Sequence, residues 1–226
     1  MQKGNTTESY ERRAQKEVAM LRNIIFDVGD VLIEYRWKDM LMDHGLSEDE
    51  AERVGYEIFN SGLWEEVFDL GLMTADEIIR EYHKKYPEDG NAIQWFIQHG
   101  EQMHVPRPEI WEKVRLLKEQ GYRIYLLSNY SELLFQQHTK NASFLQYIDG
   151  KVVSYQVHMG KPDPEIYRCL LEKFQIRPEE SIFFDDRKKN IEAAEKLGIQ
   201  GVWVTSREML NGRLDGLLSE KRGEGR

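Results

Sequence analysis

Short apolar runs that each end in polar residues constrain the fold of this chain more than any other feature. Four such runs recur along the sequence, and a fifth, shorter one lies between the second and the third. Apolar runs without polar alternation are typical of strands buried on both faces of a parallel sheet. The predicted strands lie at 23–27, 122–127, 151–154, 181–184 and 201–204.

Helical patterns separate most of these strands. Apolar residues repeat at helical spacing over 108–120, 163–174 and 188–197, and Gly121 and Gly198 stand where two of these helices should stop. Strands that alternate with helices predict an α/β fold with a mainly parallel sheet and helices on both faces.

The segment 35–105 departs from this alternation. It contains no convincing strand, and helical stretches are expected around 47–60, 74–86 and 91–104. Ser47 with Glu50, and Thr74 with Glu77, have the spacing of capping boxes at helix starts. We therefore expect an all-helical insert at 35–105, a core made of 21–34 and 106–220, a flexible N-terminal extension at 1–20 and a C-terminal tail at 221–226.

Composition limits the class of protein. Asp and Glu outnumber Lys and Arg by 40 to 31, and the net charge of -9 argues against a general binder of nucleic acids or anionic membranes. The single cysteine, Cys169, excludes an internal disulfide and a cysteine-based zinc site, and we interpret it as a packing thiol. Neither a membrane-spanning run nor a signal peptide is evident, so a cytoplasmic protein is expected.

Polar residues at the ends of the predicted strands form a chemically coherent set. Ligands of parallel sheets bind at the carboxyl ends of the strands. Carboxylates there would hold a hard cation such as Mg²⁺, while a hydroxyl, an amide and an ammonium would bind phosphoryl oxygens. Taken singly, each residue is more often a helix cap, a turn former or a surface charge. The set is Asp27, Ser128, Asn129, Lys161, Asp185 and Asp186.

The order and spacing of these residues resemble the four motifs of the haloacid dehalogenase superfamily. The matching segments are 24–32, 126–129, 160–167 and 183–194, and the resemblance covers about residues 22–205. It implies a Rossmann-like three-layer core, a small helical cap of the C1 type that covers the site, and a phosphatase that uses an aspartate nucleophile.

The resemblance also implies roles for the metal-site residues. Asp27 would be the nucleophile and a Mg²⁺ ligand, and Gly29 would offer its backbone carbonyl to the metal. Asp186 would bind the metal directly, whereas Asp185 would act through water or orient the site.

For the substrate phosphate, Ser128 and Asn129 would hold its oxygens. Lys161 would neutralise the phosphoryl group and the nucleophile. Asn190 would support the acidic loop or Lys161.

One departure concerns the general acid. Phosphatases of this superfamily usually carry a second Asp two residues after the nucleophile, where this chain has Gly29. We interpret Asp30 as a loop residue rather than a substitute acid. The form Asp-x-Gly resembles a subgroup that includes α-D-glucose-1-phosphate phosphatase, and the anomeric oxygen of a sugar 1-phosphate leaves with less acid assistance. His158, where similar sequences often have Gly, either faces solvent or borders the phosphate site.

Substrate selection is expected in the cap. The best candidates to face the site are the segment 62–66, with Trp64 and Glu65, and the nearby segment 35–37, with Trp37. The alternative is that both tryptophans only hold the cap helices together.

The leading hypothesis is a Mg²⁺-dependent phosphatase for a small metabolite, such as a sugar phosphate, acting as a monomer or homodimer. The alternatives are a dehalogenase-type C–halogen hydrolase, which needs no metal, and a non-catalytic regulator that binds a phosphorylated ligand. A phosphomutase is disfavoured because it relies on the acid that Gly29 lacks. No nucleic-acid or membrane partner is expected.

Overall fold

A five-stranded, wholly parallel sheet forms the centre of the computed structural model, which describes residues 20–223. Its strand order is β5-β4-β1-β6-β7, and each neighbouring pair is parallel. The predicted α/β fold and its five strands are confirmed. The strands are β1 (Asn23–Phe26), β4 (Arg123–Ser128), β5 (Gly150–Val153), β6 (Ser181–Asp185) and β7 (Gln200–Trp203).

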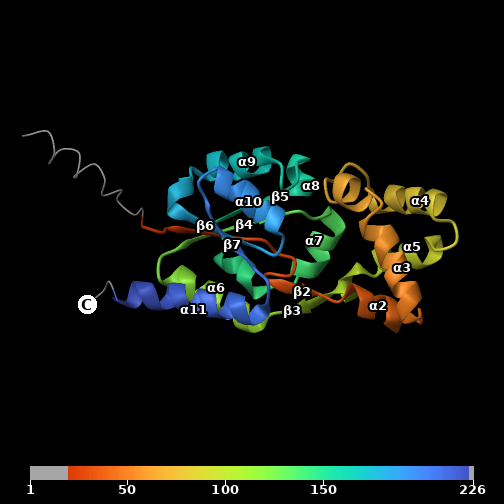
Figure 1. Cartoon of the computed structure of the whole chain (residues 1–226), viewed down its shortest axis with the longest axis horizontal. Helices are drawn as coiled ribbons and strands as arrows, with labels where there is room; N and C mark the ends of the chain where they lie inside the picture. The colour runs from red at the N-terminus through yellow and green to blue at the C-terminus, as the bar shows by residue number, and fades with distance from the viewer. Residues whose placement is uncertain (1–19, 224–226) are drawn as a thin grey trace, which may run out of the picture.

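Alternate residues of β1 supply two separate hydrophobic cores. Ile24 and Phe26 belong to the core shared with helices α6 (Pro108–Glu119) and α11 (Arg207–Gly223). Ile25 belongs to the core shared with α9 (Pro164–Phe174) and α10 (Lys188–Lys196). These two helix pairs cover opposite faces of the sheet (Figure 1). The period of two along a strand therefore explains the three-layer core and the unbroken apolar runs.

The other core helices are short. They are α7 (Glu132–Thr139), η3 (Ser143–Tyr147), α8 (Ser154–Val157) and η4 (Pro178–Glu180).

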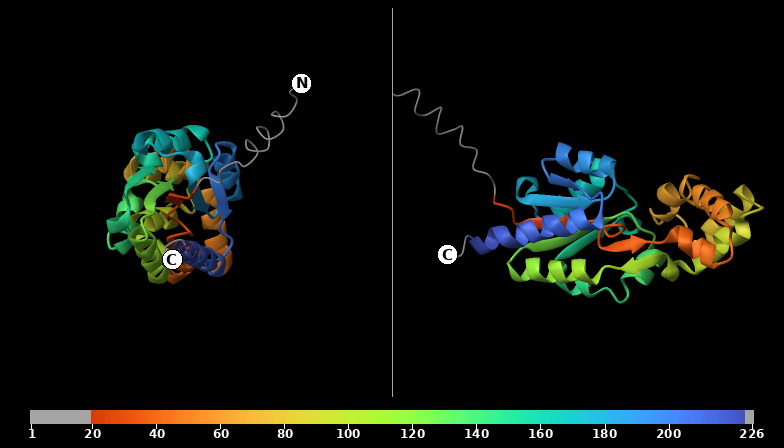
Figure 2. Two further views of the ribbon diagram at one scale, coloured as in Figure 1. Left: turned by 90° about the vertical axis from the view of Figure 1, so that its left-hand side faces the viewer. Right: turned by 60° about the horizontal axis from the view of Figure 1, so that its bottom comes forward.

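The helices of the insert form a separate group at one end of the molecule, beyond α7 and α8 (Figures 1 and 2). Both predicted capping boxes are confirmed, because each cap side chain accepts a bond from the N3 amide and each N3 glutamate accepts one from the amide of the cap residue. The elements are α2 (Trp37–Asp43), α3 (Glu48–Phe59), the π-helical turn η1 (Trp64–Phe68), α4 (Ala75–Lys85), α5 (Gly90–Gln98) and the 3₁₀ turn η2 (Gly100–Met103).

Two short strands at the root of the insert correct the prediction that 35–105 contains no strand. β2 (Ile33–Tyr35) pairs antiparallel with β3 (His104–Pro106), so that Tyr35 stands opposite His104. Each strand has three residues, too few for a visible alternation, and its partner lies about seventy residues away in the sequence. The single helix expected over 91–104 was also wrong, because α5 ends at Gln98 and the chain continues as η2 and β3.

The predicted N-terminal extension lies outside the described residues except for Met20. Helix α11 continues to Gly223 and so enters the segment predicted as a C-terminal tail. Among residues 20–223, every helix is too short or too polar to cross a membrane.

Candidate active site

The three central strands bring the first candidate residues together. Asp27 follows β1, Ser128 ends β4 and Asp185 ends β6. In the sheet Phe26 is in register with both Leu126 and Phe184, so the residues that follow converge at one edge. The Ser128 hydroxyl donates a hydrogen bond of 2.5 Å to Oδ1 of Asp27. Adjacent parallel strands thus explain why residues distant in sequence meet here.

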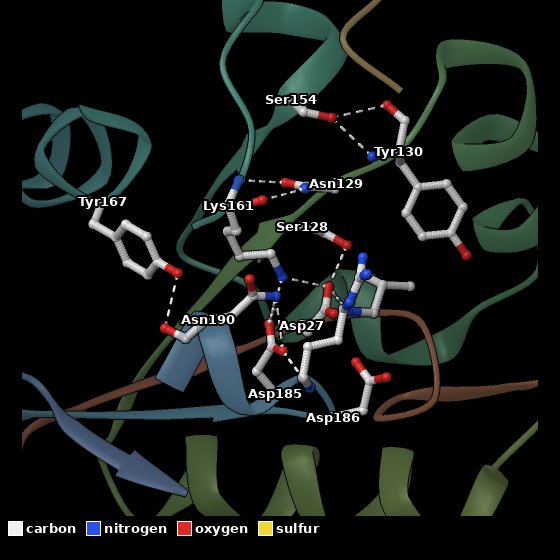
Figure 3. Close-up of polar contacts among 12 residues, drawn as sticks. Asp27, Ser128, Asn129, Tyr130, Ser154, Lys161, Tyr167, Asp185, Asp186 and Asn190 are labelled. Carbon is white, nitrogen blue, oxygen red and sulfur yellow. Dashed lines mark hydrogen bonds and ion pairs between the residues drawn. The ribbon is translucent and has the colours of Figure 1, made fainter. Parts of the chain in front are cut away.

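A buried lysine links the carboxylates of two of these strands. The Lys161 ammonium lies 3.0 Å from Oδ1 of Asp27 and 2.6 Å from Oδ2 of Asp185, and only 1% of its side chain is exposed (Figure 3). Burial alone would lower the pKa of Lys161, but the carboxylates of Asp185 and Asp27 hold it above its usual value. Lys161 is therefore a fixed positive charge beside the expected nucleophile.

Asp185 has all its acceptor positions occupied by protein groups. Its Oδ1 accepts bonds from the Arg187 amide at 2.8 Å and from the Asn190 side chain at 2.9 Å, and its Oδ2 accepts from Lys161. The Asn190 carbonyl also accepts a bond from the Tyr167 hydroxyl (Figure 3). In this arrangement Asp185 and Asn190 orient Lys161 and the acidic loop.

Asp186 completes a candidate metal centre. Within the described part of the chain, Asp27, Asp185 and Asp186 each offer an oxygen within 4.8 Å of the others, and Asp186 makes no side-chain hydrogen bond. Burial and then repulsion from Asp27 and Asp185 raise the pKa of Asp186 to about 7. Burial likewise raises the pKa of Asp27 to about 6, against the opposing effect of Lys161. Oxygen ligands with uncompensated negative charge fit a hard divalent cation such as Mg²⁺.

These pKa shifts predict how the metal-free protein responds to pH. In the unfolded state Asp27 and Asp186 lose their protons near the ordinary pKa of 3.8, whereas in the folded state they keep them up to about pH 6 and 7. The free energy of unfolding should therefore fall as the pH rises from about 4 to 7. Asp186→Asn should raise the melting temperature of the metal-free protein at pH 7.5 and remove the further rise on adding Mg²⁺. Thermal unfolding with EDTA and with Mg²⁺ measures both effects.

The exposed Asp39→Asn variant serves as the control and should retain the Mg²⁺-dependent rise. An Asp186→Asn protein that Mg²⁺ stabilises as much as wild type would rule Asp186 out as a ligand.

Asn129, expected to hold phosphate, also has a structural contact. Its side-chain amide donates to the Lys161 carbonyl at 2.9 Å and accepts from the Lys161 amide at 2.8 Å. The side chain thus fixes the backbone of Lys161, although Asn129 also lines the cavity described next.

A cavity of about 260 Å³ connects this centre with the insert. Trp64 lies in its wall and packs edge-on against Phe59 and Phe68. Trp37 also lines the cavity and packs against Phe59. Both tryptophans therefore hold the insert together and face the cavity, so the two interpretations from the sequence are compatible.

Glu65 joins the insert to the core across the cavity mouth. Its carboxylate lies 2.6 Å from Arg187 and 3.6 Å from Lys189, both from the core segment that follows β6. The Glu65 carboxylate is therefore paired with these two core cations.

Asp30 and His158 have structural contacts. Asp30 has a positive φ of 51°, and its Oδ1 accepts the Tyr35 amide at 3.0 Å, as in a loop-stabilising turn. His158 ends α8 with a φ of 54°, and its Nδ1 lies 2.8 Å from the Leu70 carbonyl of the insert. Its side chain is exposed to solvent, as one of the two interpretations expected, and it does not line the cavity.

The sequence analysis missed Asp69. This buried residue follows η1, lines the cavity and accepts the Ser131 amide at 3.0 Å. Burial raises its pKa to about 7. Asp69 belongs to the insert and does not follow a strand, so no pattern in the sequence points to it.

The structure thus combines an α/β core with a helical insert, and a centre of carboxylates and one lysine lies at the cavity between them. The family profile of haloacid dehalogenase-like hydrolases matches residues 21–198, and the chain belongs to this family. The prediction of a hydrolase is thereby confirmed.

Characterised relatives span several substrates. The chain is 28% identical to a sesquiterpene phosphatase of Aspergillus oryzae over 80% of this chain and 88% of that protein. It is 24% identical to a D-ribitol-5-phosphate phosphatase of Bacteroides thetaiotaomicron over 80% of this chain and 90% of that protein.

A solved structure of similar fold is a family enzyme of Bacteroides thetaiotaomicron in complex with magnesium and inorganic phosphate. It has a TM-score of 0.66 and 24% identity and covers 83% of this chain and 96% of that chain. L-2-haloacid dehalogenase of Xanthobacter autotrophicus shares the fold with a TM-score of 0.63 and 16% identity, over 87% of this chain and 83% of that chain.

Proposed function

We propose that this hydrolase is a Mg²⁺-dependent phosphatase acting on a small phosphorylated metabolite through an aspartyl-phosphate on Asp27. The observation that carries the proposal is the position of Lys161, whose ammonium bridges Asp27 and Asp185 while Asp186 remains free beside them. The carboxylates of Asp27 and Asp186 and the ammonium of Lys161 line the cavity, and together they suit a cation and a phosphoryl group. Phosphatase relatives add support.

In the proposed reaction an Asp27 oxygen attacks phosphorus, the P–O ester bond breaks, and the alcohol oxygen leaves and takes up a proton from water. A second water then attacks phosphorus and gives its proton to the solvent, the bond between phosphorus and the Asp27 oxygen breaks, and the carboxylate and inorganic phosphate are released. Lys161 and Ser128 hold Asp27 in place and stabilise negative charge on phosphoryl oxygens. When bound, Mg²⁺ would be held by Asp27, Asp186 and the Gly29 carbonyl and would neutralise charge on the phosphoryl group.

The substrate class follows from the cavity and from Gly29. A volume of about 260 Å³ suits a small metabolite. Because position 29 offers no acid, a leaving group that departs readily, such as the anomeric oxygen of glucose 1-phosphate, fits the site. A sugar phosphate therefore remains the proposed substrate, with Trp37, Trp64 and Glu65 of the proposed cap at 35–105 contributing to selection.

A dehalogenase-type hydrolysis is the competing function within this family. A screen of sugar 1-phosphates, sugar 6-phosphates, nucleotides and 2-haloacids, each with Mg²⁺ and with EDTA, separates the two. We expect turnover of phosphate esters that EDTA abolishes. Release of halide that persists in EDTA would contradict the proposal, and binding of phosphate esters without turnover would indicate a regulator.

We propose a cytoplasmic enzyme, monomeric or homodimeric, without nucleic-acid or membrane partners, in keeping with the net charge of -9.

A further inference from the structure

Asp69 is a buried carboxyl group that the proposed reaction does not use. The residue is 8% exposed and lines the same cavity as Asp27 and Lys161. In the described part of the chain no Lys or Arg forms an ion pair with it, and the nearby Arg187 is paired with Glu65 instead. Burying a carboxyl group without such a partner is costly. Its place in a cavity wall therefore points to a ligand that supplies the missing contact.

The backbone of Asp69 is held in place by the insert and the core together. Its amide donates to the Trp64 carbonyl at 2.9 Å, and its own carbonyl accepts the Ser154 hydroxyl. The Ser154 oxygen in turn accepts the Tyr130 amide at 2.8 Å (Figure 3). These contacts fix the position of the carboxyl group independently of a ligand, as a recognition site requires.

The two carboxyl oxygens of Asp69 have different surroundings. Oδ1 accepts the Ser131 amide at 3.0 Å, whereas Oδ2 has no hydrogen bond to any described residue. Oδ2 is nevertheless not one of the fully enclosed polar atoms that lack a partner, so it reaches the cavity that the residue lines. Burial raises the pKa of Asp69 to about 7, so at about pH 8 the group is ionised and Oδ2 only accepts hydrogen bonds.

The groups that suit the metal and the phosphoryl group all belong to the core. Asp27 follows β1, Asp186 follows β6 and Lys161 precedes α9. Asp69 comes from the insert, where it follows η1, and lines the same cavity. A phosphate ester with its phosphorus at Asp27 therefore directs its alcohol part toward the insert residues of the cavity, among which Asp69 lies.

We propose that Asp69 is a specificity-determining residue, whose free oxygen accepts a hydrogen bond from a hydroxyl or ammonium group on the alcohol part of the substrate. This inference rests on the proposed phosphatase function and narrows its substrate class to phosphate esters of polyols, sugars or amino alcohols. An apolar alcohol would leave the buried oxygen without a partner, and the enzyme discriminates against such esters for that reason.

The test compares three six-carbon esters, hexyl phosphate, sorbitol 6-phosphate and 6-aminohexyl phosphate. The alcohol part of the first has no hydrogen-bond donor, that of the second has hydroxyls and that of the third has an ammonium. At about pH 8 wild type should prefer the second or the third ester to the first in kcat/KM by at least about 10-fold, the effect of one charge-assisted hydrogen bond in a site built for it. The preferred ester shows whether the donor is a hydroxyl or an ammonium.

Asp69→Asn changes the free atom from an acceptor to a donor, while the amide oxygen of the new side chain still accepts the Ser131 amide. The preference should fall by about 10-fold, whereas turnover of hexyl phosphate should stay close to wild type. Asp76→Asn, the same change at an exposed position of α4, is the matched control and should keep the wild-type preference.

Equal use of the three esters by wild type, or a wild-type preference in Asp69→Asn, overturns the inference. The first of these outcomes needs no variant, so the test holds even if Asp69→Asn fails to fold. Turnover of p-nitrophenyl phosphate by wild type with Mg²⁺ separates the two levels of the proposal. Its absence counts against the phosphatase function, whereas its presence with equal use of the three esters counts against Asp69 alone.

Discussion

Asp27→Asn should reduce phosphatase turnover by about 10⁴-fold or more, because an amide cannot attack phosphorus as a carboxylate does. The variant should remain folded, since Asn has nearly the same size and Lys161 retains its contact of 2.6 Å with Asp185. Steady-state kinetics with the best ester from the substrate screen, together with a thermal unfolding curve, measure both expectations.

Asp30→Asn is the matched control for this variant. It makes the same chemical change three residues later, and an amide oxygen can still accept the Tyr35 amide that Asp30 Oδ1 now accepts. Turnover should stay close to wild type. A loss in Asp30→Asn as large as that in Asp27→Asn would show that Asp30 takes part in the chemistry and that its interpretation as a loop residue is wrong.

Lys161→Met should have the largest effect on stability. The Lys161 side chain is 1% exposed, and the side chains of its partners Asp27 and Asp185 are 11% and 0% exposed. Removing the ammonium therefore leaves buried negative charge without a partner. Breaking a buried pair in this way costs on the order of 3–5 kcal/mol. Urea unfolding of the metal-free protein at pH 7.5 measures the free energy of unfolding, and turnover should fall as well because the phosphoryl group loses its fixed cation.

A second substitution distinguishes the two possible causes of lost stability, an unpaired buried carboxylate and the lost packing of the lysine side chain. Lys161→Met combined with Asp185→Asn should recover part of the lost stability, because the buried carboxylate that lost its partner is then neutral. Lys84→Met, in a surface pair with Glu81, should leave stability unchanged. If Lys161→Met unfolded at the same urea concentration as wild type, the buried ion pair would not have the energetic role assigned to it.

The core of the site could be predicted from the sequence for a simple physical reason. Asp27, Ser128 and Asp185 each sit at the end of an apolar run, and parallel strands bring such ends together whatever the sequence distance. The capping boxes at Ser47 and Thr74 could also be predicted, because their contacts join residues only three positions apart.

Contacts between the insert and the core could not be predicted in this way. Asp69 accepts the amide of Ser131, 62 residues further along the chain, and Tyr35 fills the space at Gly29 from β2, a three-residue strand that pairs with the distant β3. The bonds between the Asn129 side chain and the Lys161 backbone could not be predicted either, because they depend on how two loops meet. These positions follow from tertiary packing, which leaves no periodic pattern in the chain.

The central claim is a covalent phosphoryl intermediate on Asp27, and chemical trapping tests it most directly. The enzyme is denatured at short times during turnover with Mg²⁺, reduced with borohydride and analysed by peptide mass spectrometry. An acyl phosphate is reduced to an alcohol, so homoserine should appear at position 27, and its formation should require both substrate and Mg²⁺. Homoserine at a different aspartate, or turnover that proceeds unchanged in Asp27→Asn, would contradict the account.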